Sequence, residues 1–262
     1  MIPVVVGQIP ICWSVQRNVE VVTEAVRRTD PGSLLVLPEA ALSGYDDELS
    51  GLAGLDPERI GWACEQVAAA ATAADVIVVC GTLLPEDGHW WNAGICFRPG
   101  RPPWIYRKVN LAMHERGRLN AGSALPTVPL QLPAGEVIVG IQLCREIRFP
   151  EQWHHLARQG AQLLIYLTYA ANPAEPPGVW RAHLISRAAE TQRFLVAANV
   201  AHPDQHCPSL IVSPRGEVLG EAAPGQAARL ECSLDLTAVR DHYLDQQRGD
   251  VVRITGPRER AE

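Results

Sequence analysis

The chain alternates between short apolar runs and polar segments that contain Gly, Pro or charged residues. Apolar runs of about four to eight residues with such boundaries are typical of β-strands. Two segments rich in Pro and Gly, residues 85–88 and 214–216, are predicted to be tight turns between neighbouring strands. The pattern predicts strands at residues 2–9, 34–37, 76–81, 91–97, 104–107, 128–132, 136–143, 163–167, 194–199, 209–212, 217–221 and 228–234.

Segments with helical spacing lie between these strands. Ser14 is the predicted N-cap of a helix whose apolar positions are Val15, Val19, Val22 and Val26. Asp56 and Pro57 are a predicted N-cap and first helical residue, and the Ala-rich helix that they open extends to about residue 74. Further helices are predicted at residues 150–159, with Gly160 as the C-terminal stop, and at 179–192.

The interleaving of strands and helices predicts an α/β protein. Because several strands are joined by tight turns, the sheet is expected to be mixed rather than purely parallel. The 262 residues contain no low-complexity segment, no fixed repeat and no linker-like tract, and the prolines and glycines are scattered. We therefore expect a single domain over residues 1–262.

Composition narrows the possible partners and location. The formal net charge is −6, which argues against a general nucleic-acid binder or a binder of anionic membranes. No apolar stretch approaches the roughly 20 residues needed to span a bilayer, and the N-terminus resembles a strand rather than a signal peptide. The seven cysteines are dispersed without a CxxC pair. These features predict a soluble cytoplasmic protein, and the mixed-charge tail at 253–260 is expected to be a solvated terminus.

Three reactive side chains each follow an apolar run. Glu39 follows residues 34–38, Lys108 follows 104–107, and Cys144 follows 137–143. Strand ends are where α/β sheets present functional groups, so these three residues are candidates for one site. A thiol that attacks an amide or nitrile carbon needs a base for its proton and a positive charge for the oxyanion, and a carboxylate and an ammonium supply them.

Each residue alone has a simpler interpretation. Cys144 is also compatible with a half-buried structural cysteine, Glu39 with a surface carboxylate and Lys108 with a solvated cation. His154 and His155, on the helix after Cys144, are a rival source of a base. The combination of three residue types favours the common site, because the chemistry needs one of each. The histidines are the weaker source of a base, because adjacent residues on a helix point to different faces.

Three segments carry a specific resemblance. Residues 38–45 (Pro-Glu-Ala-Ala-Leu-Ser-Gly-Tyr), 106–111 (Tyr-Arg-Lys-Val-Asn-Leu) and 144–151 (Cys-Arg-Glu-Ile-Arg-Phe-Pro-Glu) resemble the signature segments of the nitrilase superfamily of carbon–nitrogen hydrolases. They occur in that family's order. Other similar positions are Gln8, Trp180, residues 186–190 and residues 209–216.

The resemblance implies a four-layer αββα sandwich and a Glu-Lys-Cys triad. Glu39 would be the general base, Lys108 the oxyanion stabiliser and Cys144 the nucleophile, with the main-chain N–H of Arg145 completing the oxyanion hole. Glu115, ahead of Gly117, would orient Lys108 or the substrate; a loop salt bridge with Arg116 or Arg118 is the alternative. The family also implies a homodimer, and the triad requires no metal or organic cofactor.

The sequence departs from the family's pattern beside the nucleophile, where an aromatic residue is common and Arg145 stands here. Its guanidinium is a candidate to bind a substrate carboxylate, and a salt bridge to Glu146 or Glu151 is an equal alternative. Downstream, Thr191 and the segment 207–209 also differ. Tyr45 and Tyr169 are candidate substrate-binding residues, and residues 170–178 are expected to form the rim of the pocket. Trp90 and Trp91 are assigned to the core or an interface.

The sequence thus predicts an amidase that hydrolyses a small linear amide, releasing ammonia through a thioester on Cys144. A nitrilase and an N-carbamoyl amine hydrolase are the alternatives within this chemistry. A catalytically silent member that binds a small molecule or a protein is the alternative from another class, and an acyltransferase is a further one.

Overall fold

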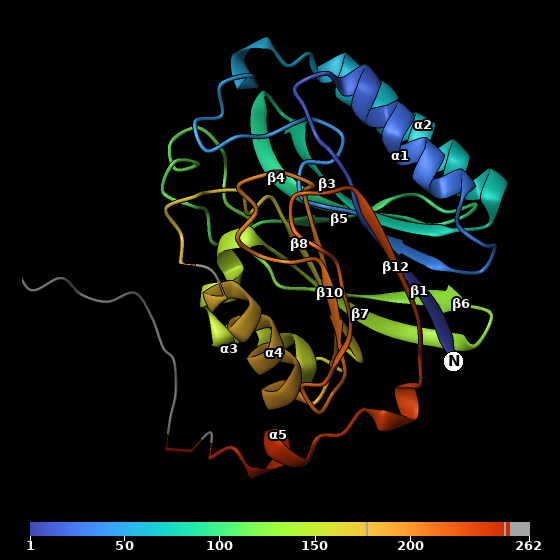
Figure 1. Cartoon of the computed structure of the whole chain (residues 1–262), viewed down its shortest axis with the longest axis vertical. Helices are drawn as coiled ribbons and strands as arrows, with labels where there is room; N and C mark the ends of the chain where they lie inside the picture. Colours follow the sequence, from blue (N-terminus) through green and yellow to red (C-terminus); the bar gives the residue numbers. More distant parts are fainter. Residues whose placement is uncertain (177, 249, 252–262) are drawn as a thin grey trace, which may run out of the picture.

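The computed structural model of the protein describes residues 1–176, 178–248 and 250–251. Two six-stranded sheets lie face to face (Figure 1). Helices α1 (Val15–Arg27) and α2 (Pro57–Ala74) cover the outer face of one sheet, and α3 (Pro150–Arg158) and α4 (Val179–Thr191) cover the outer face of the other. This is the αββα sandwich expected from the sequence. Pro177, within the expected pocket rim, and the tail at 253–260 lie outside the described residues.

The first sheet has parallel pairing at its centre and antiparallel pairing at both edges. Strands β1, β2 and β3 are parallel to one another, whereas β12, β4 and β5 pair antiparallel with their neighbours. The strands lie in the order β12 (Ala228–Leu234), β1 (Ile2–Gln8), β2 (Leu34–Val36), β3 (Ile77–Glu86), β4 (His89–Phe97) and β5 (Trp104–Arg107).

The second sheet has the same plan. Strands β7, β8 and β9 are parallel, and β6, β10 and β11 are added by antiparallel pairing. Its order is β11 (Val218–Glu221), β10 (Leu210–Val212), β9 (Phe194–Asn199), β8 (Leu163–Thr168), β7 (Gly135–Leu143) and β6 (Thr127–Leu132). The sheets are therefore mixed, as the sequence predicts.

The long helices begin and end close to the positions that the sequence predicts. Ser14 caps α1, where its side chain accepts from the N–H of Arg17, and Asp56 caps α2 in the same way through Glu58. The helices are α1 (Val15–Arg27), α2 (Pro57–Ala74), α3 (Pro150–Arg158), α4 (Val179–Thr191) and the short α5 (His242–Gln246), with 3₁₀ helices at Leu52–Gly54, Cys144–Arg148 and Leu236–Ala238. The sequence pattern predicts neither α5 nor the 3₁₀ helices.

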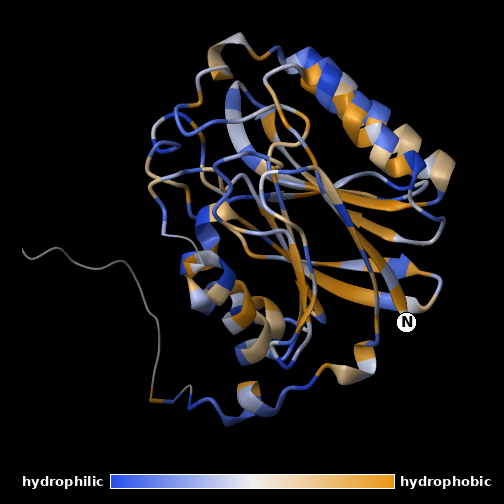
Figure 2. Ribbon diagram, in the orientation of Figure 1, coloured by the Kyte–Doolittle hydropathy of each residue, from blue (hydrophilic) through white to orange (hydrophobic). Residues whose placement is uncertain are grey.

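The core consists of three apolar layers and a smaller cluster that contains Ala40, Tyr45, Leu49, Leu83 and Leu119. The layer between the sheets contains side chains from both of them, such as Val6 and Val36 from the first and Val139 and Ile165 from the second. A second layer lies between the first sheet and helices α1 and α2, and a third lies between the second sheet and α3 and α4. Figure 2 shows the strands as largely hydrophobic ribbons and the helices as two-sided. Because both faces of each sheet are covered, the central strands contain almost no polar position.

The prediction of a turn at residues 85–88 is partly wrong. Pro85 belongs to β3 and pairs with Trp90, while the turn itself is formed by Asp87 and Gly88, which have φ values of 51° and 76°. Strand β2 pairs with β3 only as far as Val79. The missing N–H of Pro85 therefore breaks no ladder on that side, and the hairpin can extend past it.

Two further observations concern the chain as a whole. In the described ranges, no helix combines the length and the apolar character that a bilayer crossing requires. All seven cysteines are unpaired, and Cys80 and Cys96 are fully buried, as their apolar surroundings in the sequence predict.

Candidate active site

Glu39 lies just beyond β2, where the chain turns inward instead of continuing as a strand. The carbonyl of Pro38 accepts from the N–H of Gly81 on β3 at 2.8 Å, and Ala40 has a φ of 54°. A Cβ atom at Gly81 would lie 2.5 Å from the Cα of Glu39. Only glycine allows this approach, and it places the Glu39 side chain fully inside the protein.

Lys108 follows the last residue of β5 and is held by the main chain on both sides. Its N–H donates to the carbonyl of Asn92 at 2.8 Å, and its carbonyl accepts from the N–H of Gly122 at 2.8 Å. The side chain is 0% exposed. The lysine is therefore a buried cation that requires negative partners, not a solvated surface charge.

Cys144 directly follows β7, which ends at Leu143, and begins the 3₁₀ helix Cys144–Arg148. Its φ of 41° lies in the left-handed region that residues other than glycine seldom adopt. The hydroxyl of Tyr166 donates to the Cys144 carbonyl at 2.7 Å and stabilises this backbone conformation. Strained residues of this kind cluster at functional sites, which fits the candidate role of the thiol.

The structure brings Glu39, Lys108 and Glu115 into direct contact. Lys108 Nζ donates to Glu39 Oε1 and to Glu115 Oε1, at 3.0 Å in each case. The amide nitrogen of Asn92, on β4, donates to the same two oxygens at 2.7 and 2.6 Å. One ammonium and one amide thus join two buried carboxylates. Glu115 does not pair with Arg116 or Arg118, so the alternative of a loop salt bridge is wrong.

The two candidate tyrosines support the carboxylates. The hydroxyl of Tyr45 donates to Glu115 Oε1 at 2.8 Å and lies 2.7 Å from Nε2 of His114. The main-chain N–H of Tyr169 donates to Glu39 Oε2 at 2.8 Å. The rings of Tyr45 and Tyr169 pack with their centroids 5.4 Å apart. Each tyrosine therefore orients one carboxylate of the cluster.

The charge states follow from this geometry. Burial disfavours the ammonium of Lys108, but the negative charges of Glu39 and Glu115 outweigh it and raise the pKa of Lys108. Burial likewise opposes ionisation of Glu115, yet Lys108 and the hydrogen bonds from Asn92 and Ala112 hold its pKa below the usual value. At neutral pH the cluster therefore retains a fixed ammonium next to ionised Glu115.

The thiol of Cys144 lies within the electrostatic reach of this cluster. Burial and the negative charge of Glu39 raise the pKa of Cys144 to about 12, while Lys108 opposes the rise and Glu115 adds to it. The side chain of Cys144 is only 7% exposed. The sulfur is therefore a thiol at neutral pH and needs a base in order to become a nucleophile.

Arg145 makes neither of the salt bridges considered from the sequence. Among the residues that the structure describes, it forms no ion pair with Glu146 or Glu151, and its guanidinium lies over the ring of Trp180 at 5.8 Å. Arg148 lies over the same ring at 5.5 Å but pairs with Glu175 at 3.3 Å. Of these two arginines, Arg145 is the one whose charge is not neutralised by a described carboxylate.

The rival histidines are engaged elsewhere. His154 lies 3.7 Å from Glu190 on α4, and the exposed His155 contacts Gln159 on its own helix. The charged groups that act on the Cys144 thiol are Glu39, Lys108 and Glu115.

The sequence pattern does not predict two buried polar residues of this region, Asn92 and Glu146, as parts of the site. Asn92 is a polar residue inside the otherwise apolar run 91–97, and that interruption was the available signal. Glu146 is 0% exposed and accepts four hydrogen bonds from the segments that flank Lys108 and Cys144. From the sequence, the only expectation for Glu146 is a salt bridge to its neighbour Arg145.

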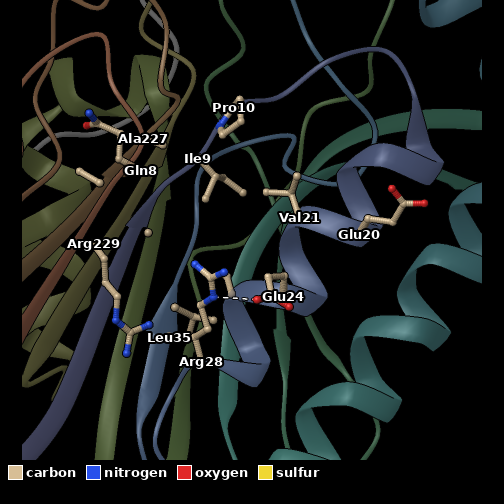
Figure 3. Close-up of a pocket in the computed structure, with 13 residues that line it drawn as sticks. Gln8, Ile9, Pro10, Glu20, Val21, Glu24, Arg28, Leu35, Ala227 and Arg229 are labelled. Carbon is tan, nitrogen blue, oxygen red and sulfur yellow. Dashed lines mark hydrogen bonds and ion pairs between the residues drawn. The ribbon is translucent and has the colours of Figure 1, made fainter.

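One largely apolar cavity lies away from these residues. It has a volume of about 550 Å³ and lies beside α1, β1 and β12 (Figure 3). Gln8 on its wall donates to the carbonyls of Ala223 and Gln226, and Arg28 pairs with Glu24 at 2.7 Å. The cavity contains no nucleophile and its polar groups are occupied, so it is not the candidate site.

A second cavity borders the cluster. It has a volume of about 970 Å³ and is lined by Leu49, Trp90, His114 and Arg118, among others. His114 contacts Tyr45, which donates to Glu115. Trp90, assigned to the core or an interface from the sequence, is thus half-buried on a cavity wall.

Comparison with known proteins identifies the family of the chain. Residues 4–241 match the model of the carbon–nitrogen hydrolase family. An (R)-stereoselective amidase from a Pseudomonas species is 31% identical over 88% of this chain and 83% of its own length. Omega-amidase NIT3 of Saccharomyces cerevisiae is 28% identical over 81% and 78%, and a 2-oxoglutaramate amidase of Paenarthrobacter nicotinovorans is 26% identical over 90% and 85%.

Comparison with solved structures agrees with the sequence matches. An amidase from Nesterenkonia sp. AN1 superposes with a TM-score of 0.82 at 22% identity, and the match covers 96% of this chain and 98% of that one. The shared fold, the family match and the amidase relatives lead to one conclusion. The chain belongs to the carbon–nitrogen hydrolase family and is an enzyme of the amidase-like branch of the nitrilase superfamily.

Proposed function

We propose that this enzyme hydrolyses a small linear amide to a carboxylate and ammonia through a thioester on Cys144. The observation that carries the proposal is the buried cluster in which Lys108 Nζ contacts both Glu39 and Glu115 at 3.0 Å, within the electrostatic reach of the Cys144 thiol. Nucleophile, base and fixed positive charge are the three groups that thiol-dependent acyl transfer requires.

In the first half of the reaction, Cys144 Sγ attacks the amide carbon and its proton passes to Glu39. Oε1 of Glu39 already accepts from Asn92 and Lys108, whereas Oε2 accepts, among the residues that the structure describes, only from the N–H of Tyr169. Oε2 is therefore the oxygen with capacity for the proton. The ammonium of Lys108 and the N–H of Arg145 stabilise the oxyanion, and Glu39 returns the proton to the leaving nitrogen as ammonia departs.

In the second half, water replaces ammonia. Glu39 takes a proton from a water molecule, whose oxygen attacks the thioester carbon. The tetrahedral intermediate collapses, the carbon–sulfur bond breaks, and the proton on Glu39 returns to Cys144 Sγ. The product forms as a carboxylic acid and releases its remaining proton to solvent, so one amide and one water give one carboxylate and one ammonium ion. Glu115, held by Tyr45 and Asn92, keeps Lys108 charged and in position.

The state of the free thiol can be measured directly. Because the pKa of Cys144 is raised to about 12, we expect the wild type minus Cys144→Ala difference in ultraviolet thiolate absorbance to stay flat below about pH 10. A thiolate signal from Cys144 at neutral pH would instead indicate a preformed ion pair, and Glu39 would not be needed as the base for attack.

Arg145 is our candidate for substrate selection. Its charge has no described carboxylate partner, and the relative named 2-oxoglutaramate amidase acts, by its name, on an amide that carries a carboxylate. We propose that Arg145 binds a carboxylate at the far end of the substrate.

Arg145→Ala should therefore raise KM for glutaramate about tenfold or more, with little change for the neutral amide pentanamide. Steady-state ammonia release with the two amides measures this effect. Arg181→Ala is the matched control, because Arg181 is partly exposed and pairs with Glu221, and it should alter neither KM. Equal effects of Arg145→Ala on both amides would remove Arg145 from substrate recognition.

A screen for ammonia release from small amides, nitriles and N-carbamoyl amines tests the proposed reaction as a whole. Turnover of one or more amides that exceeds turnover of the matching nitriles and N-carbamoyl amines is the expected result. Turnover confined to nitriles or N-carbamoyl amines would reassign the substrate, and no turnover across the panel would favour a binding protein. Thioester decay that is faster with added amines than with water would indicate an acyltransferase.

A further inference from the structure

Glu146 is a buried carboxyl group that joins two segments of separate sheets. Its Oε1 accepts from the N–H of Val109 at 2.8 Å and from the N–H of Asn110 at 3.1 Å. Its Oε2 accepts from the N–H of Leu143 at 2.8 Å. Val109 directly follows Lys108 after β5 of the first sheet, and Leu143 directly precedes Cys144 at the end of β7 in the second.

A further contact lies on the other side of Lys108. The hydroxyl of Tyr106, on β5, donates to Glu146 Oε1 at 2.7 Å. The Glu146 carboxyl group therefore holds the chain before and after Lys108, while the carbonyl of Glu146 accepts from the indole N–H of Trp153 at 3.0 Å and ties the other end to α3. Glu146 itself makes no hydrogen bond or ion pair with Glu39 or Lys108 in the part of the chain that the structure describes.

The chemistry of these contacts explains why the residue is an acid. All four partners of the side chain are N–H or O–H donors, and a carboxylate is the side chain that offers only acceptors. Burial raises the pKa of Glu146 to about 7, although the donors from Leu143, Tyr106 and Asn110 favour the ionised form. Taking a carboxyl group out of water costs free energy, and the four donors to Glu146 offset part of that cost.

We propose that Glu146 is a positioning residue that sets the distance between the Lys108 ammonium and the Cys144 sulfur by fastening the two sheets at these two residues. The inference rests on the proposed roles of Lys108 and Cys144. Since a displacement of about 1 Å of a catalytic group can lower the rate about 100-fold, a single carboxyl group that spans both segments has a large effect without touching the substrate.

Glu146→Gln tests this role. The amide nitrogen of glutamine would face at least one of the donors, so the two segments should separate locally. We expect kcat to fall about 100-fold while KM stays within about threefold, because the binding surface is retained. The rate constant for alkylation of Cys144 by iodoacetamide should also fall, since Lys108 opposes the rise in the pKa of that thiol and would act on it from farther away.

The control separates positioning from loss of stability. Val22→Ala removes buried volume under α1, far from both segments, and should lower Tm without changing kcat, KM or the alkylation rate. Tyr106→Phe removes one donor and keeps the carboxylate, so kcat should fall up to about tenfold. In the Glu146→Gln background, Tyr106→Phe should lower kcat by a smaller factor than it does in the wild type, because the side chains of Tyr106 and Glu146 share one contact.

The outcomes are distinct. A Glu146→Gln variant with wild-type kcat and wild-type alkylation of Cys144, or one that changes only KM, would overturn the proposal. If Glu146→Gln does not fold, Tyr106→Phe decides, and unchanged kcat and alkylation in that variant would overturn it. If the wild-type enzyme releases ammonia from no amide, the proposed function fails, while the alkylation rates still decide the role of Glu146.

Discussion

Replacing Cys144 with alanine should lower kcat at least about 1,000-fold for every amide that the wild type hydrolyses. The sulfur forms the covalent bond in the proposed reaction, and alanine has no group that could form it. The fold should remain, because the buried Cys144 side chain is small and alanine adopts the same left-handed backbone conformation at Ala40. We expect Tm to stay within about 5 °C of the wild type. Ammonia release and thermal unfolding measure the two quantities.

Cys80→Ala is the matched control for this prediction. Cys80 is also a fully buried cysteine, but it packs between the first sheet and helices α1 and α2. Its replacement should lower stability slightly and leave kcat unchanged. If Cys144→Ala kept more than about one part in a thousand of the wild-type kcat, the nucleophile would have to be another group.

Lys108→Met should have the largest combined effect on activity and stability. The methionine removes the ammonium that holds the oxyanion, and kcat should fall about 1,000-fold. It also leaves Glu39 and Glu115 buried beside each other without the cation that contacts both at 3.0 Å. Breaking a buried pair from one side typically lowers the free energy of unfolding by about 3–5 kcal/mol. Urea unfolding and steady-state kinetics measure the two losses.

The stability loss should depend on pH in a direction that the charges determine. In the wild type, Lys108 holds the folded-state pKa of Glu115 below its usual value of 4.5, so this stabilisation is present above 4.5 and is lost as the pH falls through the lower folded value. In Lys108→Met, burial should raise the pKa of Glu115 once the cation is gone, so the variant gains stability as the pH falls. The difference between the two proteins should therefore be smaller at about pH 5 than at about pH 8.

Arg107→Met provides the neighbouring control. Arg107 precedes Lys108 on β5, but it is partly exposed and pairs with Glu86 at the surface. Its loss should change the free energy of unfolding by less than about 1 kcal/mol, without pH dependence of the kind expected for Lys108. If the two variants had equal effects on stability and kcat, Lys108 would not be the buried charge on which the site depends.

Most of the fold could be predicted from local pattern. The strands appear as apolar runs, and Ser14, Asp56 and Gly160 mark helix boundaries at or near the observed ones. The sequence pattern places Pro85 in a turn, but it lies in β3. A proline fits there because β2 does not extend beside it, and the length of a neighbouring strand cannot be read from the local sequence. The single domain and the homodimer stay predictions.

Only part of the site could be predicted from the sequence, because some of its residues act through partners that are far away in the chain. Glu39, Lys108 and Glu115 were identified by residue type and order, and the structure brings them into contact. Asn92 and Glu146 act through hydrogen bonds between segments far apart in the sequence, and no local pattern reports such partners. Arg145 could not be placed from the sequence either, because Trp180, the residue it lies against, comes from α4.

The most direct test is the mass of the enzyme captured during turnover. Wild-type protein mixed with a hydrolysed amide and quenched rapidly in acid should gain the mass of the amide less that of ammonia, on the peptide that contains Cys144 and not in Cys144→Ala. A gain on any other residue, or one that persists in Cys144→Ala, would show that Cys144, Glu39 and Lys108 do not work together on one carbonyl.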